Sequence, residues 1–113
     1  MTTSVQASDP RNASIRIWVN GALKPRAEAM VSVFDSGFVL GDGVWEGLRV
    51  SAGHPAFLDA HLDRLYEGAK ALMIDIGLDR AALTRAIYAT LAANDMRDGV
   101  HARLMVTRGI KRT

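Results

Sequence analysis

The sequence predicts an α+β fold, a small domain with an antiparallel-rich sheet and two helices. Side chains over residues 44–50 alternate between two faces with the period of a strand. Asn20-Gly21, between two short apolar runs, is typical of a tight β-hairpin turn. Apolar residues between 62 and 76 recur at the spacing of one helical face. Short strands joined by turns and then followed by helices are the pattern of an α+β domain.

The composition narrows the class of protein. A chain of 113 residues is enough for one domain with a modest core. Its formal net charge is +2 and it has no block of basic residues, so it lacks the charge pattern of a nucleic-acid-binding protein. It has no cysteine, and its 3 histidines lack metal-ligand spacing, so no metal site is expected. Without a membrane-length apolar run or a signal peptide, the sequence predicts a cytoplasmic protein with no membrane partner.

The chain is expected to divide into a flexible arm over residues 1–13, which is polar, and one domain over residues 14–113. Pro25 is expected to stop the second strand of the hairpin, because proline removes a backbone donor. The predicted strands are residues 15–19, 22–23, 29–34, 44–50, 54–58 and 101–107.

Two helices are predicted from apolar periodicity and capping residues. Asp59 is expected to cap the first helix, which Gly77 ends, and Asp79 is expected to cap the second. The buried face of the first helix is predicted to contain Leu62, Leu65, Tyr66, Ala69, Leu72, Met73 and Ile76. That of the second is predicted to contain Leu83, Ala86, Ile87, Thr90 and Leu91.

The strand over residues 44–50 has an unusual face. Trp45, Gly47 and Arg49 project from it, which places an aromatic wall, a missing side chain and a fixed positive charge in a row. A small anionic molecule lying over Gly47 would find a guanidinium suited to its carboxylate. The alternative is that Trp45 belongs to the core and Arg49 ends an exposed edge strand. On the opposite, apolar face, the Glu46 carboxylate requires hydrogen-bonding or cationic partners, or else it must be protonated and neutral.

Arg64 lies among small residues on the first predicted helix. Ala60 and Gly68 are one turn away from it, and Ala71 is two turns away. Small neighbours indicate that something packs closely there. It is either another backbone element, with Arg64 in a structural role, or an anionic ligand that needs room.

Three motifs in order resemble the fold-type IV pyridoxal-phosphate enzymes. They are GDGVWEGLR over residues 41–49, HLDRL over 61–65 and RLMVTRG over 103–109. This class contains branched-chain and D-amino-acid aminotransferases, (R)-amine transaminases and aminodeoxychorismate lyase. The resemblance covers residues 15–111 and implies the small N-terminal domain of a class IV aminotransferase. It further implies pyridoxal 5'-phosphate as cofactor and a homodimer, and the apolar run at 38–40 is a candidate for the dimer interface or for the mouth of the pocket.

The resemblance also implies roles for single residues. Arg64, in HLDRL, matches the arginine that binds the cofactor phosphate. Arg49 matches the arginine of the EG-x-R motif of the branched-chain enzymes, and Trp45 stands where relatives place a tyrosine or phenylalanine that lines the substrate pocket. Arg103 matches an arginine that reaches the substrate site. Phe38 is expected to be an aromatic residue of the pocket or of an interface.

No catalytic residue is expected within this chain. The resemblance places the Schiff-base lysine beyond Thr113, in a larger second domain. Lys24, Lys70 and Lys111 do not match its context. Because the chemistry depends on that lysine, the 113-residue chain alone is expected to be inactive.

The function implied is transamination between an amino acid and a 2-oxo acid, as part of a complete enzyme. The stretch Glu46-Gly47-Leu48-Arg49 favours a branched-chain substrate, whereas Gly-Asp-Gly-Val with an aromatic residue and Glu resembles the D-amino-acid and lyase types. Donor and stereochemistry therefore stay open, with aminodeoxychorismate lyase and (R)-amine transaminase as alternatives. A non-catalytic interaction or dimerisation module is the alternative from another class.

Overall fold

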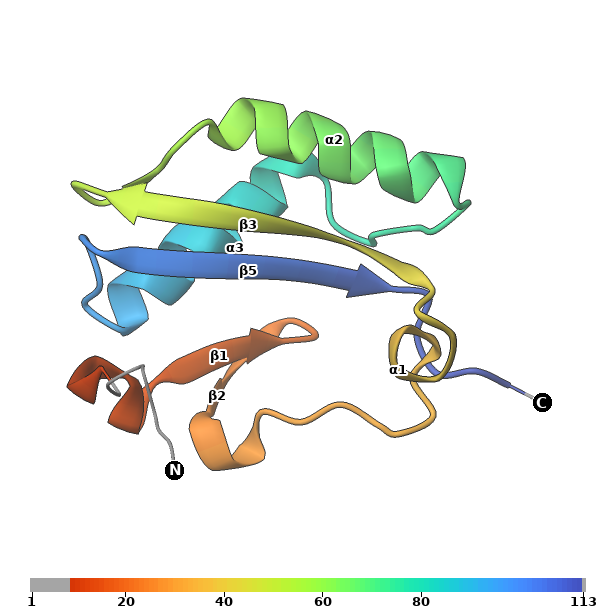
Figure 1. Ribbon diagram of the computed structural model, residues 1–113, viewed down its shortest axis with the longest axis horizontal. Coiled ribbons are helices and arrows are strands. Elements are labelled where there is room, and N and C mark those ends of the chain that lie inside the picture. Colours follow the sequence, from red (N-terminus) through yellow and green to blue (C-terminus); the bar gives the residue numbers. More distant parts are fainter. Residues whose placement is uncertain (1–8, 113) are drawn as a thin grey trace, which may run out of the picture. The chain divides into compact units, whose positions relative to one another are not determined.

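The computed structural model describes residues 9–112, which fall into two compact units, one ending at Met30 and one beginning at Val31 (Figure 1). In the first unit the elements are η1 (Pro10–Ser14), β1 (Arg16–Val19), β2 (Ala22–Pro25) and η2 (Arg26–Glu28). In the second they are α1 (Ser36–Leu40), β3 (Gly43–Ser51), β4 (His54–Pro55), α2 (Leu58–Ala71), α3 (Arg80–Ala93) and β5 (Val100–Thr107).

The first unit contains the predicted hairpin. β1 and β2 pair antiparallel, and both turn residues have positive φ, 49° at Asn20 and 93° at Gly21. A two-residue turn with positive φ at both positions matches the twist of the strands, which confirms the prediction from Asn-Gly. In the polar stretch before it, Pro10–Ser14 form a 3-10 helix, with the Asp9 side chain accepting from the Arg11 backbone N–H. Residues 1–8 of the expected arm lie outside the described residues.

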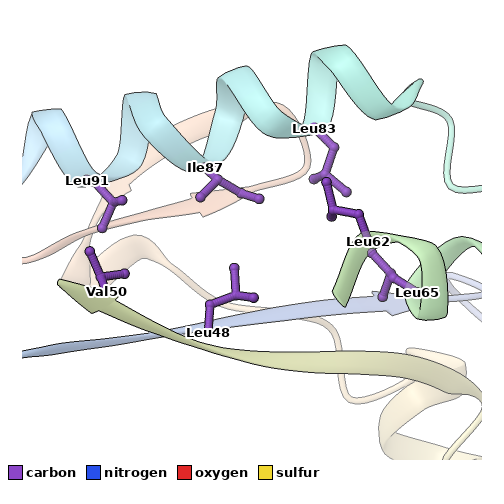
Figure 2. Packing of buried hydrophobic residues seen from close by; sticks show 7 residues of the cluster. All are labelled: Leu48, Val50, Leu62, Leu65, Leu83, Ile87 and Leu91. Atoms are coloured by element: carbon purple, nitrogen blue, oxygen red, sulfur yellow. The ribbon is translucent and has the colours of Figure 1, made fainter. Parts of the chain in front are cut away.

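The second unit is built on an antiparallel sheet with the strand order β4-β3-β5. Together with the two main helices, this sheet confirms the α+β class. Figure 2 shows how β3 contributes to the core, with side chains from α2 and α3 pointing toward it. The buried cluster comprises Leu48, Val50, Leu62, Leu65, Leu83, Ile87 and Leu91. Full burial of one such side chain stabilises the fold by about 1.5–3 kcal/mol.

Helix α2 differs from the prediction at both ends. Phe57, not Asp59, occupies its N-cap, and no side chain caps the first turn. The helix ends at Ala71, well before Gly77, because the chain turns in a Schellman motif. In that motif the N–H of Met73 donates to the carbonyl of Lys70 at 3.0 Å. Met73 has φ 57° and an 86% exposed side chain, and Leu72 is 42% exposed, so neither belongs to the buried face that was predicted.

The other helix follows its prediction. Asp79 caps α3, accepting from the Ala82 N–H at 2.7 Å. The residues Leu83, Ala86, Ile87 and Leu91 are buried, as the periodicity indicated.

The predicted strand over residues 29–34 is absent. These residues follow η2 without regular structure, and their large apolar side chains are exposed, with Phe34 at 66%. Strand preference alone does not form a strand when no neighbouring strand supplies a ladder. The predicted strand over 54–58 is likewise reduced to His54–Pro55, because the chain leaves the extended conformation at Phe57, where φ is 54°.

We expect Met73→Gly to stabilise the protein by about 1 kcal/mol, because a side chain in the left-handed region is strained and glycine is not. Urea unfolding measures the change. Ala71→Gly, in the last turn of α2, is the control and should destabilise by about 0.5–1 kcal/mol. Equal destabilisation by both substitutions would contradict the strain at Met73.

Candidate functional site

Glu46 is a buried carboxylate held between β3 and α2. Its residue exposure is 3%, and Arg64 donates to both of its oxygens, from Nε to Oε2 and from Nη2 to Oε1, each at 2.8 Å. His61 Nδ1 lies 2.6 Å from the same Oε1. His61 and Arg64 are three residues apart on α2, so both face one side of the helix. These contacts supply the partners that a carboxylate on an apolar face requires.

The pair is ionic. The hydrogen bond from Arg64 lowers the pKa of Glu46 and outweighs desolvation, which acts in the opposite direction. The same bond raises the pKa of Arg64. Although Glu46 is buried, the Arg64 side chain is 73% exposed. A guanidinium has more N–H donors than these two bonds use, so Glu46 fixes the orientation of Arg64 while leaving donors for an external anion.

The small residues near Arg64 have different explanations. A Cβ on Gly68 would lie 3.2 Å from Cγ1 of Val44, so Gly68 is where α2 approaches β3 closely. Ala60 and Ala71 are exposed and contribute no such packing. Close packing therefore accounts for Gly68, whereas the Arg64 side chain itself is directed to the surface.

The opposite face of β3 carries a second cluster with β5. The register pairs Trp45 with Met105, Gly47 with Arg103 and Arg49 with His101. The guanidinium carbon of Arg103 lies 4.5 Å from the ring centroid of Trp45, which is a cation–π contact. Trp45 is 57% exposed, so the alternative that it belongs to the core is wrong.

The space above Gly47 is occupied by a side chain that the motifs did not indicate. A Cβ on Gly47 would lie 3.0 Å from Nε2 of His101, so the imidazole covers the position where a ligand was expected. Arg49, His101 and the neighbouring Gly99 and Val100 line a shallow hollow beside it. The signal that could have found His101 is its place two residues before Arg103 on the same strand face.

The candidate residues thus form two groups. Trp45, Arg103, Gly47 and Arg49 share the outer face of the sheet, whereas Arg64 lies on the helix-covered side, because successive strand residues alternate. Phe38, on α1, is 74% exposed. Among the described residues, no group of three or more His, Cys, Asp or Glu could hold a metal ion. No described helix is long and apolar enough to cross a membrane.

A family model decides the relationship. The model of amino-transferase class IV matches residues 43–113, which is more than half of the chain. The chain belongs to the class IV aminotransferase family.

The chain is similar to relatives from more than one branch of the class IV family. The chain is 48% identical over 104 residues to branched-chain-amino-acid aminotransferase-like protein 1 of Arabidopsis thaliana, covering 92% of this chain and 19% of that protein. It is 36% identical over 95 residues to the aminodeoxychorismate lyase of Bacillus subtilis, covering 83% of this chain and 32% of that protein.

Solved class IV structures share the fold. A branched-chain amino acid aminotransferase from T.th., complexed with N-(5'-phosphopyridoxyl)-L-glutamate, matches with a TM-score of 0.78 and 33% identity over 88% of this chain and 34% of that chain. A 4-amino-4-deoxychorismate lyase from Pseudomonas aeruginosa matches with a TM-score of 0.63 and 44% identity over 75% of this chain and 30% of that chain. The chain therefore spans about a third of these enzymes and has the fold of their N-terminal part.

We expect Glu46→Gln to destabilise the protein by about 1.5–3 kcal/mol at pH 7, because the charge-assisted bonds to Arg64 are lost. The pKa of Glu46 is lowered from its ordinary value of 4.5, so its contribution is present above that pH and is lost as pH falls through the folded-state pKa. The difference between wild type and variant should therefore shrink toward pH 3, as urea unfolding at several pH values will measure.

Glu67→Gln, on an exposed position of the same helix, is the matched control and should change stability little at any pH. A loss at Glu46 that stays constant from pH 7 to pH 3 would show that the carboxylate charge is not what stabilises the fold.

Proposed function

We propose that this chain forms the N-terminal part of a pyridoxal-phosphate-dependent aminotransferase. The enzyme would move an amino group between an amino acid, favoured to be branched-chain-like, and a 2-oxo acid. The observation that carries the proposal is the buried Glu46, which holds the exposed guanidinium of Arg64 by two hydrogen bonds. Membership of the class IV family supports it, and the T.th. relative is complexed with a phosphopyridoxyl compound.

The residues present fit a phosphate. Arg64 would hold the cofactor phosphate with the N–H donors that Glu46 leaves free, and its cationic form is favoured by that carboxylate. His61 would contribute by sharing Oε1 of Glu46, which restrains the carboxylate from a second direction. When bound, pyridoxal phosphate supplies an electron sink for the substrate carbon that carries the amino group.

The outer face of the sheet fits the substrate side. Among the described residues, no carboxylate pairs with Arg49 or Arg103, so both positive charges are available for a substrate carboxylate. The contact with Trp45 restrains the Arg103 guanidinium. His101, rather than an open space over Gly47, would set the shape of this part of the pocket.

The remaining parts of the complete enzyme are also proposals. The Schiff-base lysine would lie in the portion of the class IV relatives that this chain does not span. Phe38, Val39 and Leu40 are exposed on α1 and are proposed to contact a second copy in a homodimer. Aminodeoxychorismate lyase is the second candidate function, favoured by the 44% identity to the Pseudomonas aeruginosa lyase.

In the full-length protein, Arg64→Ala should raise the cofactor dissociation constant about tenfold to a hundredfold for each charged hydrogen bond lost. Arg64→Lys should restore part of the affinity, because lysine lacks the planar fork. Absorbance titration of the apoprotein measures both, and Arg85→Ala, at an exposed position of α3, is the control. Unchanged cofactor affinity in the Arg64→Ala variant would contradict the assignment of Arg64 to the phosphate.

Light scattering of the same holoprotein tests the proposed homodimer. A stable, active monomer would contradict it.

Arg49→Ala should lower kcat/KM by an amount equivalent to about 1.5–3 kcal/mol while leaving cofactor affinity nearly intact, because Arg49 projects from the face of β3 that is opposite to α2, which carries Arg64. Gly47→Val should raise KM by displacing the His101 ring. Kinetics with an L-branched-chain amino acid, a D-amino acid and an (R)-amine, each with an oxo acid, and with aminodeoxychorismate identify the reaction. Normal kinetics in both variants would mean that this face is structural.

A further inference from the structure

We infer that Arg108 is a positioning residue, which fixes how far along β3 the helix α2 lies and thereby holds Arg64 opposite Glu46. The inference rests on the proposed role of Arg64 in binding the cofactor phosphate. Arg108 lies just after β5 and touches neither Arg64 nor Glu46, so it would act through the helix.

One guanidinium joins three segments of the second unit. Nε of Arg108 donates to Oδ2 of Asp42 at 2.6 Å, in the turn that leads into β3. Nη2 donates to the carbonyl of Leu72 at 2.7 Å, and Nη1 to that of Met73 at 3.1 Å. Because the last carbonyls of a helix lack partners within it and carry partial negative charge, a cation is well placed at this end of α2.

This bridge joins Asp42, just before β3, to Leu72, just after α2, and is the first of three matched contacts along the strand and the helix. The helix runs back along the strand, so that its end lies beside the start of β3 (Figure 1). Asp42 is joined to Leu72 through Arg108. Val44 lies against Gly68, and Glu46 pairs with Arg64. The two-residue interval between contacts spans about 6.6 Å along the strand, and the four-residue interval spans about 6 Å along the helix. Successive contacts therefore have nearly the same spacing on both elements.

Apart from the Glu46–Arg64 pair itself, which is also directional, the contacts do not constrain the helix equally. The Val44–Gly68 contact and the buried cluster are apolar, and apolar burial is not directional. The hydrogen bonds of Arg108 to a carboxylate and two carbonyls fix both distance and direction. Arg108 is therefore the directional restraint at the end of α2. A slip of one helical turn, about 5.4 Å, would remove Arg64 from Glu46.

The test uses the full-length enzyme and measures the dissociation constant of pyridoxal phosphate by titration of the apoprotein. Arg108→Ala should weaken binding about tenfold, and Arg108→Lys less, because an ammonium lacks the fork that spans these acceptors. Asp42→Asn should weaken binding in the same direction. Arg85→Ala should bind as wild type does.

A double-mutant cycle separates positioning from general destabilisation. Adding Arg108→Ala to Arg64→Ala should cause little further loss of affinity, since there is no longer a guanidinium to position. Hydrogen exchange of the apoprotein should show faster exchange at the Met73 and Ile74 amides, which close the end of α2, in Arg108→Ala.

The outcomes distinguish the two proposals. If Arg64→Ala leaves cofactor affinity unchanged, the proposed function of Arg64 fails. If Arg64→Ala weakens binding but Arg108→Ala and Asp42→Asn bind as wild type does, or if the losses from Arg64→Ala and Arg108→Ala simply add, the positioning role is overturned while the proposed function stands. Should Arg108→Ala fail to fold, Arg108→Lys and Asp42→Asn decide the question by the same titration.

Discussion

The burial of Glu46 between a strand and a helix is the constraint on which the second unit depends. A buried carboxylate without partners would lower the free energy of unfolding by several kcal/mol. The fold therefore requires the two hydrogen bonds from Arg64 and the contact with His61. They tie α2 to β3 at a defined point. The same arrangement presents a cation of fixed orientation at the surface, so the interaction that satisfies the interior also creates the candidate anion site.

Neighbouring residues of β3 serve different surfaces. Glu46 faces the helix and Trp45 faces outward, because side chains alternate along a strand. The proposed cofactor contact and the proposed substrate contacts therefore belong to opposite sides of one element. A substitution on one side is expected to leave the other side unchanged as long as the pairing of β3 with β5 holds.

Local rules were reliable where a few adjacent residues decide the structure. Asn20-Gly21 forms the expected turn, and Asp79 caps α3 as its position before an apolar run indicated. They were wrong at the end of α2, where Met73 takes the left-handed conformation that usually calls for glycine. They were also wrong over residues 29–34, where an apolar run lacks a partner strand.

The sequence alone determined the buried face of α3, the fold class and, through its motifs, the family and the candidate Arg64. These depend on spacing within a single segment, which can be counted along the chain. The tertiary structure alone decided that Arg64 donates hydrogen bonds to Glu46, that His101 covers Gly47 and that Arg108 joins Asp42 to the end of α2. Each of these contacts joins segments distant in the chain, and their meeting depends on strand register and on the position of a helix along a strand, which no local pattern specifies.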